Sequence, residues 1–131
     1  MQNRYHIGVD YHKRYSHLVV KDERGVIMRS GRVGNSKEEV AAFLQPFEQE
    51  PRRAVLEATR NWTVMYDWLE EVCDEVILAN PLKVKAIAEA KIKTDKIDAT
   101  ILSDLLRVDL LPTAYVPRKH LMALVRHCIL K

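Results

Sequence analysis

The sequence predicts an α/β domain with a mixed central sheet and helices on both of its faces. Two observations lead to this prediction. Residues 5–33 contain three strand-like segments in succession, separated only by short turns. From residue 36 onward, helical patterns alternate with two further strand-like segments. The length of 131 residues and the 47% hydrophobic content suit one domain with a substantial core.

The N-terminal segments predict a meander of three strands. Residues 5–10 form an apolar run that ends at Asp10, and residues 16–21 form a second run with a strongly apolar centre. Residues 22–25, Asp-Glu-Arg-Gly, predict the turn into a third strand over residues 26–33. Apolar and polar residues alternate only imperfectly in this third segment, as is typical of an edge or half-exposed strand.

Caps and apolar spacing predict the next elements. Ser36 and Glu39 form a capping box before a helix whose apolar residues recur at i, i+3, i+4 and i+7. Residues 54–57 then form a short apolar run that ends at Glu57. A second helix has the same spacing, and a strand over residues 76–79 follows it. The two apolar stripes are Val40, Phe43, Leu44 and Phe47, and Met65, Trp68, Leu69 and Val72.

Two further helix starts complete the order. Asn80 is a capping residue followed by proline at the first helical position, where the missing N–H costs nothing. Thr94 and Asp95 open another helix. Its predicted apolar side holds Ile97, Ile101 and Leu105. Three strands followed by helix, strand, helix, strand and helix is the order of a ribonuclease-H-like (RuvC-like) fold.

Four acidic residues stand at the ends of these elements. Asp10 and Glu57 each end an apolar strand, while Asp95 and Asp98 lie three residues apart at a helix start and so share one helix face. Strand ends and helix starts along one edge of an α/β sheet are where such proteins place their sites. Convergent carboxylates suit hard cations such as Mg²⁺. The sequence therefore predicts a metal site that acts on phosphate.

Each acid taken alone also has a structural explanation. Asp10 fits a turn residue, and a carboxylate such as Glu57 at the end of a buried strand needs a partner to offset its desolvation. Asp95 and Asp98 complement the dipole of the helix that they open. The combination of all four favours the metal site. His12 lies two residues beyond Asp10, but we do not count it as a ligand.

The distribution of charge indicates contact with nucleic acid. The net charge of +3 is too small to decide this, but residues 83–96 contain five lysines against two acidic residues. A basic excess beside a metal site suits a polyanion, although a solvated helix face is the alternative interpretation. The predicted phosphate contacts are Lys13, Arg14, Arg60, Lys83, Lys85, Lys91, Lys93 and Lys96.

Composition favours a cytoplasmic protein. No apolar stretch approaches the roughly 20 residues that cross a bilayer, and the N-terminus lacks the apolar region of a signal peptide. Cys73 and Cys128 show no paired or metal-ligand spacing. We therefore expect both to be buried thiols in a reducing compartment, with no membrane among the partners.

Four segments of the chain resemble one known family in the same order and at similar separations. That family is the DEDD transposases of bacterial insertion sequences, which include the Piv-type DNA invertases. The resemblance covers nearly the whole chain, as the family's N-terminal RuvC-like domain, and its most specific part is the run that begins at Lys93. The segments are Ile7-Gly8-Val9-Asp10-Tyr11-His12-Lys13, Leu56-Glu57-Ala58-Thr59, Ala79-Asn80-Pro81 and Lys93-Thr94-Asp95-Lys96-Ile97-Asp98-Ala99.

The resemblance implies a function. Asp10, Glu57, Asp95 and Asp98 would form a catalytic tetrad that holds Mg²⁺, with Mn²⁺ as a substitute, and works on DNA strands. A structured guide RNA encoded by the element is a further expected partner. We also expect a homo-oligomer in the intact protein.

The chain departs from the family pattern in two places. Arg60 stands where the family commonly has glycine after Glu-Ala-Thr, so we expect a different turn and an extra phosphate contact there. The family's coiled-coil region and C-terminal domain, which bears a serine nucleophile, have no counterpart here. We therefore expect an N-terminal fragment that does not complete strand exchange alone. Its catalytic domain would span residues 1–111, with a linker and the start of a truncated helix over residues 112–131.

Three alternatives are weighed against this interpretation. A stand-alone RuvC-like nuclease of the Holliday-junction-resolvase type shares the fold, and a non-catalytic nucleic-acid-binding module would use the same lysines. An ATPase of the actin and sugar-kinase type also opens with a Gly-x-Asp strand, but it needs glycine and a hydroxyl residue after the aspartate to admit phosphate. Tyr11-His12-Lys13-Arg14 supplies neither. Titration with Mg²⁺ distinguishes a catalytic domain from a binding module.

Overall fold

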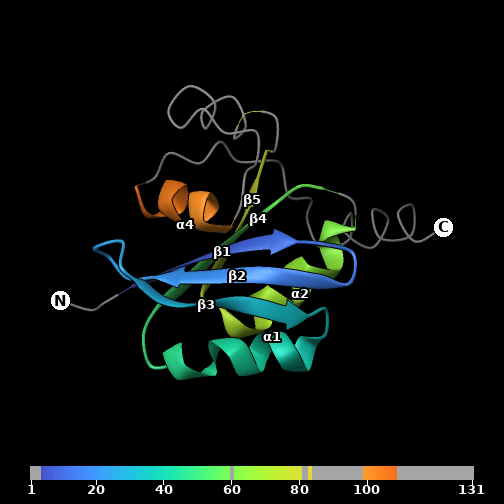
Figure 1. The fold of residues 1–131 in the computed structure, drawn as a ribbon, viewed down its shortest axis with the longest axis horizontal. Helices are drawn as coiled ribbons and strands as arrows, with labels where there is room; N and C mark the ends of the chain where they lie inside the picture. Colours follow the sequence, from blue (N-terminus) through green and yellow to red (C-terminus); the bar gives the residue numbers. More distant parts are fainter. Residues whose placement is uncertain (1–3, 60, 81–82, 84–98, 109–131) are drawn as a thin grey trace.

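The computed structural model describes residues 4–59, 61–80, 83 and 99–108, which form a layered α/β arrangement (Figure 1). The order within the sheet is β3-β2-β1-β4-β5. Pairing is antiparallel from β3 to β1 and parallel from β1 to β5. This confirms the predicted ribonuclease-H-like fold with its mixed sheet. The strands are β1 (Tyr5–Tyr11), β2 (Tyr15–Lys21), β3 (Ile27–Gly34), β4 (Arg52–Glu57) and β5 (Glu75–Ala79).

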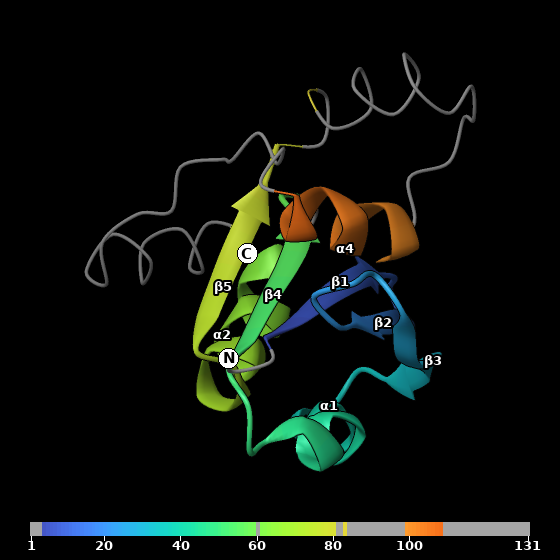
Figure 2. The same cartoon turned by 90° about the vertical axis from the view of Figure 1, so that its left-hand side faces the viewer.

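Helices cover both faces of the sheet, as predicted (Figure 1 and Figure 2). One face carries α1 (Lys37–Leu44), the short 3-10 turn η1 (Gln45–Phe47) and α2 (Trp62–Val72). The other face carries α4 (Ala99–Arg107). Ser36 caps α1 as predicted, because its Oγ accepts a hydrogen bond from the backbone N–H of Glu39. In the described part of the chain, no helix is long and apolar enough to cross a membrane.

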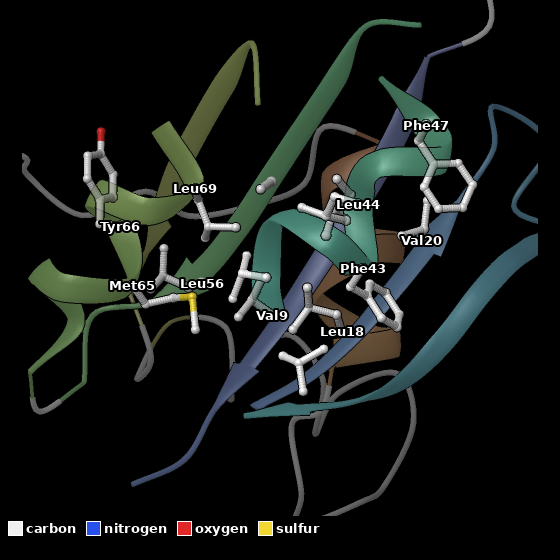
Figure 3. Close-up of a cluster of buried hydrophobic side chains, with 14 of the residues drawn as sticks. Val9, Leu18, Val20, Phe43, Leu44, Phe47, Leu56, Met65, Tyr66 and Leu69 are labelled. Carbon is white, nitrogen blue, oxygen red and sulfur yellow. The ribbon is translucent and has the colours of Figure 1, made fainter. Parts of the chain in front are cut away.

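The larger hydrophobic core lies between the sheet and the helices α1 and α2 (Figure 3). Strands supply it from every second position, because successive side chains of a strand point to opposite faces. The predicted stripe of the first helix is buried in full, whereas in α2 Trp68 and Val72 are only partly buried. The buried residues of this larger core include Ile7, Val9, Leu18, Val20, Val40, Phe43, Leu44, Leu56, Met65 and Leu69.

The opposite face of the sheet approaches α4 closely because Gly8 has no side chain. A Cβ atom at Gly8 would overlap the backbone carbonyl of Ala99. The hydroxyl of Ser103 donates to the backbone carbonyl of His6 at 2.8 Å. These two contacts hold the axis of α4 directly against β1.

The buried side of α4 differs from the predicted one. Val55 and Ala79 of the sheet form a smaller apolar cluster with Leu102, Leu105 and Leu106. Leu105 is buried as predicted, but Ile101 is only partly buried, and Ile97 lies outside the described residues. The buried side of α4 is thus wider than the predicted stripe, because Ala99 and Ser103 also lie against β1, at Gly8 and His6.

An ion pair ties α4 to the neighbouring strand. Lys21 of β2 is buried, with a side chain that is 6% exposed, and its Nζ lies 2.6 Å from Oδ1 of Asp104. A buried ammonium group needs such a partner, since desolvation of an unpaired charge is costly. The pair therefore fixes the position of α4 across β1 and β2.

The remaining predictions concern the cysteines and the C-terminal segment. Cys73 is a free, half-buried thiol that packs against the larger core, and burial raises its pKa to about 12. Cys128, and the division between residues 1–111 and 112–131, lie outside the described residues.

Substitution of Gly8 tests the contact between β1 and α4. Gly8→Ala is expected to lower the free energy of unfolding by about 2–3 kcal/mol, because the new methyl group meets backbone that has to move. Gly31→Ala is the matched control, since its Cβ meets only the side chain of Phe43, at 3.2 Å. Urea denaturation measures both variants. An equal loss for the two substitutions would contradict the proposed role of Gly8.

Candidate functional site

Asp10 and Glu57 lie side by side at the C-terminal ends of two neighbouring parallel strands. The residues that precede them are paired across β1 and β4, so the two acids stand level. Gly8 faces α4, and Asp10 lies two positions after it on β1. Val55 packs under α4, and Glu57 lies two positions after it on β4. Residues two apart on a strand share a face. Both carboxylates therefore point to the face of the sheet that carries α4.

The two carboxylates influence each other electrostatically. Burial raises the pKa of Glu57 above its usual range, and the negative charge of Asp10 raises it further. Both effects act in the same direction, since a buried carboxylate loses its hydration and a like charge opposes its ionisation. A cation placed between the two groups would oppose both effects, because a nearby positive charge favours the ionised form of a carboxyl group.

His12, which the sequence does not predict as a ligand, contacts the carboxylate of Asp10. Its Nε2 lies 2.9 Å from Oδ2 of Asp10. The backbone of His12 is fixed because its N–H donates to the carbonyl of Tyr15 at 3.0 Å and its carbonyl accepts from the side-chain amide of Asn35. The imidazole stacks on the ring of Tyr15, with 4.9 Å between the ring centroids. The only signal in the sequence was its position two residues after Asp10, in the turn that leaves the strand.

Three of the predicted basic residues are described. Lys13 and Arg14 are exposed at the tip of the β1–β2 hairpin, immediately beyond the strand that bears Asp10. Lys83 is exposed, and its backbone N–H donates to Oδ1 of Asn80 at 3.2 Å, the bond expected of a helix cap. Arg60, Lys85, Lys91, Lys93 and Lys96 lie outside the described residues.

The described residues contain half of the predicted acidic cluster. Asp95 and Asp98 lie outside the described ranges, and within those ranges no group of three or more histidine, cysteine or acidic side chains is arranged to hold a metal ion. Asp10 and Glu57 nevertheless provide two converging oxygen ligands, the donor type that hard cations prefer. The chemistry open to this arrangement is the binding of a divalent cation beside a phosphate group.

Comparisons with known proteins identify the family. Among solved structures, T. thermophilus RuvC in complex with a Holliday junction substrate is 15% identical in sequence, with a TM-score of 0.45 over 94% of this chain and 88% of that chain. No match was found among curated proteins. The model of the DEDD transposases of the IS110 type, described as "Transposase", matches residues 7–128. Because this match spans most of the sequence, the chain belongs to the DEDD transposase family.

Proposed function

We propose that this chain is the metal-dependent catalytic domain of a DNA transposase. Asp10, Glu57, Asp95 and Asp98 would together hold Mg²⁺, or Mn²⁺ in its place, for the cleavage and transfer of DNA strands. The observation that carries the proposal is the pair of level carboxylates on β1 and β4, both on one face of the sheet. A structured guide RNA, a homo-oligomeric assembly and a cytoplasmic location belong to the same proposal.

The raised pKa of Glu57 supports a cation at this position. A carboxylate that is destabilised by burial and by a neighbouring aspartate gains from a positive charge more than an isolated surface acid does. His12 adds a hydrogen-bonding partner that orients one oxygen of Asp10. The donor set is therefore suited to a hard divalent ion.

The position of Asp98 in the sequence, next to the start of α4, also favours one site for all four acids. Ala99 packs against Gly8, which precedes Asp10 by two residues. Asp98 is the residue before Ala99 in the sequence. The predicted helix start that bears the second acidic pair is thus joined directly to the part of α4 that contacts the strand of the first pair.

The residues of the site divide the work of strand cleavage. Divalent ions, when bound, polarise the phosphate and stabilise the attacking and leaving oxygens. Asp10 and Glu57 would hold those ions, while the hydrogen bond with His12 keeps the carboxylate of Asp10 in one orientation. Lys13 and Arg14 at the hairpin tip contact the phosphates that flank the reacting one. The chain thus supplies both the acidic centre and part of its basic border.

Divalent ions are expected to stabilise the chain through these acids. At a Mg²⁺ or Mn²⁺ concentration 100 times the Kd, binding to the folded state adds about 2.7 kcal/mol, which raises the Tm by several degrees. Asp10→Asn and Glu57→Gln should each remove most of this response. Glu70→Gln, an exposed acid on α2, should keep it. A full response in Asp10→Asn would show that the ion binds elsewhere.

The pH dependence of stability provides a second test in the absence of metal. Because the pKa of Glu57 is raised in the folded chain, the folded state binds this proton more tightly than the unfolded state does. The resulting stabilisation is present below the unfolded pKa, near 4.5, and is lost as pH rises through the folded pKa. In EDTA, Glu57→Gln should therefore be more stable than the unsubstituted chain at pH 7 and equally stable near pH 4. An equal gain in stability from Glu57→Gln at pH 7 and at pH 4 would contradict a raised pKa of Glu57 in the folded chain.

Catalysis itself is tested with DNA that carries the ends of the element. The chain is incubated with Mg²⁺, this DNA and the transcribed guide RNA, and strand products are resolved on denaturing gels. Cleavage that is lost in Asp10→Ala supports the proposed centre. Metal-dependent cutting of a four-way junction without any preference for element ends would instead support the stand-alone nuclease. Binding without any metal response would support the non-catalytic module.

A further inference from the structure

Arg32 stands in register with Asp10 across the sheet, although no motif in the sequence singles it out. Asp10 pairs with His17 of β2, and His17 pairs with Arg32 of β3. Neighbouring strands are about 4.8 Å apart, so the backbones at Asp10 and Arg32 are separated by about 10 Å. Glu57 continues the same line on the other side. One row across four strands therefore runs from two carboxylates, through an imidazole, to a guanidinium.

All four side chains of this row lie on the face of the sheet that carries α4. On β2, Lys21 contacts α4, and His17 precedes it by an even number of positions. On β3, a Cβ atom at Gly31 would meet the side chain of Phe43 in α1, and Val33 belongs to the larger core. Arg32 stands between these two residues and so points to the opposite face.

Tyr15 holds Arg32 in position without neutralising it. The guanidinium carbon lies 3.9 Å from the centroid of the Tyr15 ring, a cation–π contact. The same ring stacks with that of His12 at 4.9 Å, and His12 contacts Asp10. The described residues provide no carboxylate for Arg32. Arg32 is exposed, and within the described ranges its N–H groups have no hydrogen-bond acceptor.

Arg29, on the same strand, shows the contrast. Its Nη1 donates to the backbone carbonyl of Phe43 at 3.1 Å, and its guanidinium lies 4.4 Å from the centroid of the Phe43 ring. Arg29 thus attaches β3 to α1 on the far face of the sheet. The structural explanation that accounts for Arg29 does not extend to Arg32, whose described side-chain interaction is the cation–π contact with the half-buried ring of Tyr15.

We propose that Arg32, positioned by Tyr15, binds a phosphate of the nucleic-acid strand that enters the site at Asp10 and Glu57. This inference rests on the proposed function. The ligand is the phosphodiester backbone, because the planar guanidinium pairs with two phosphate oxygens at once. His17 and Ser30, hydrogen-bonded to each other at 3.1 Å on the same face, add polar groups along the path.

The distance between Arg32 and the carboxylates of Asp10 and Glu57 allows opposite charges to bind different parts of one nucleic-acid strand. The carboxylates favour a cation at the reacting phosphate, whereas a guanidinium beside them would compete with that cation. Separation by two strands places the positive charge on a neighbouring phosphate instead. Because Tyr15 directly follows Arg14 at the hairpin tip, Arg32 extends the basic border formed by Lys13 and Arg14.

The salt dependence of binding tests this role. The full chain is titrated with two end-labelled single strands of the same sequence, one of DNA and one of RNA, in buffer that contains EDTA. Arg32→Gln is expected to weaken binding about tenfold at low salt. It should also reduce the slope of log K against log salt concentration by about 0.7, the value for one phosphate contact on a single strand.

Two arginines provide matched controls. Arg29→Gln makes the same change of charge on the same strand but on the opposite face, and should leave the slope unchanged. Arg24→Gln makes it in the β2–β3 turn, where the side chain is 85% exposed, and should also leave the slope unchanged. Tyr15→Leu keeps the charge but removes the support, so it should weaken binding about threefold with an unchanged slope. The Tm of each variant verifies its fold.

Each outcome decides the proposal. A reduced slope for Arg32→Gln with either probe supports it and identifies the strand that lies on the row. An unchanged slope with both probes overturns it, and so does an equal reduction for Arg24→Gln. The binding assay contains no divalent ion, so its result does not depend on whether Mg²⁺ stabilises the chain through Asp10. An unchanged salt slope for Arg32→Gln would likewise not contradict metal binding at Asp10 and Glu57.

Discussion

The close contact between α4 and β1 is the constraint on which the rest of this structure depends. Gly8 admits the backbone of Ala99, and Ser103 then reaches the carbonyl of His6. The contact covers the first half of β1, whereas Asp10 comes two residues later, where the side chain is 19% exposed. Among the described residues, the glycine therefore sets the place at which α4 lies closest to the sheet, two residues before Asp10.

The acidic pair on this face is a cost to the metal-free fold. Burial and the charge of Asp10 both raise the pKa of Glu57, which means that its ionised form is less stable here than in water. Functional sites commonly retain such unfavourable groups, because a bound ligand offsets the cost that the empty site carries. Arg32 of β3 is separated from Asp10 by two strand spacings, so it does not neutralise that carboxylate.

Much of the fold could be predicted because local patterns report which residues are buried. All five strands are present, and apolar runs placed their ends within two residues, including the ends at Asp10 and Glu57. The cap at Ser36 was also predicted. The buried side of α4 was predicted only in part, because the inward positions of Ala99 and Ser103 depend on their contacts with Gly8 and His6 of β1.

The sequence by itself determined the order of the elements, the two acids at strand ends and the membership of the chain in its family. Only the tertiary structure decided which strands are neighbours and in what register they pair. Cross-strand pairing joins segments that are distant along the chain, and the alternation of side chains within one strand carries no information about its neighbour. For this reason the row that brings Arg32 level with Asp10 could be established only from the tertiary structure. The contact of His12 with Asp10 depends instead on the conformation of the turn between His12 and Tyr15, which residue identity alone does not specify.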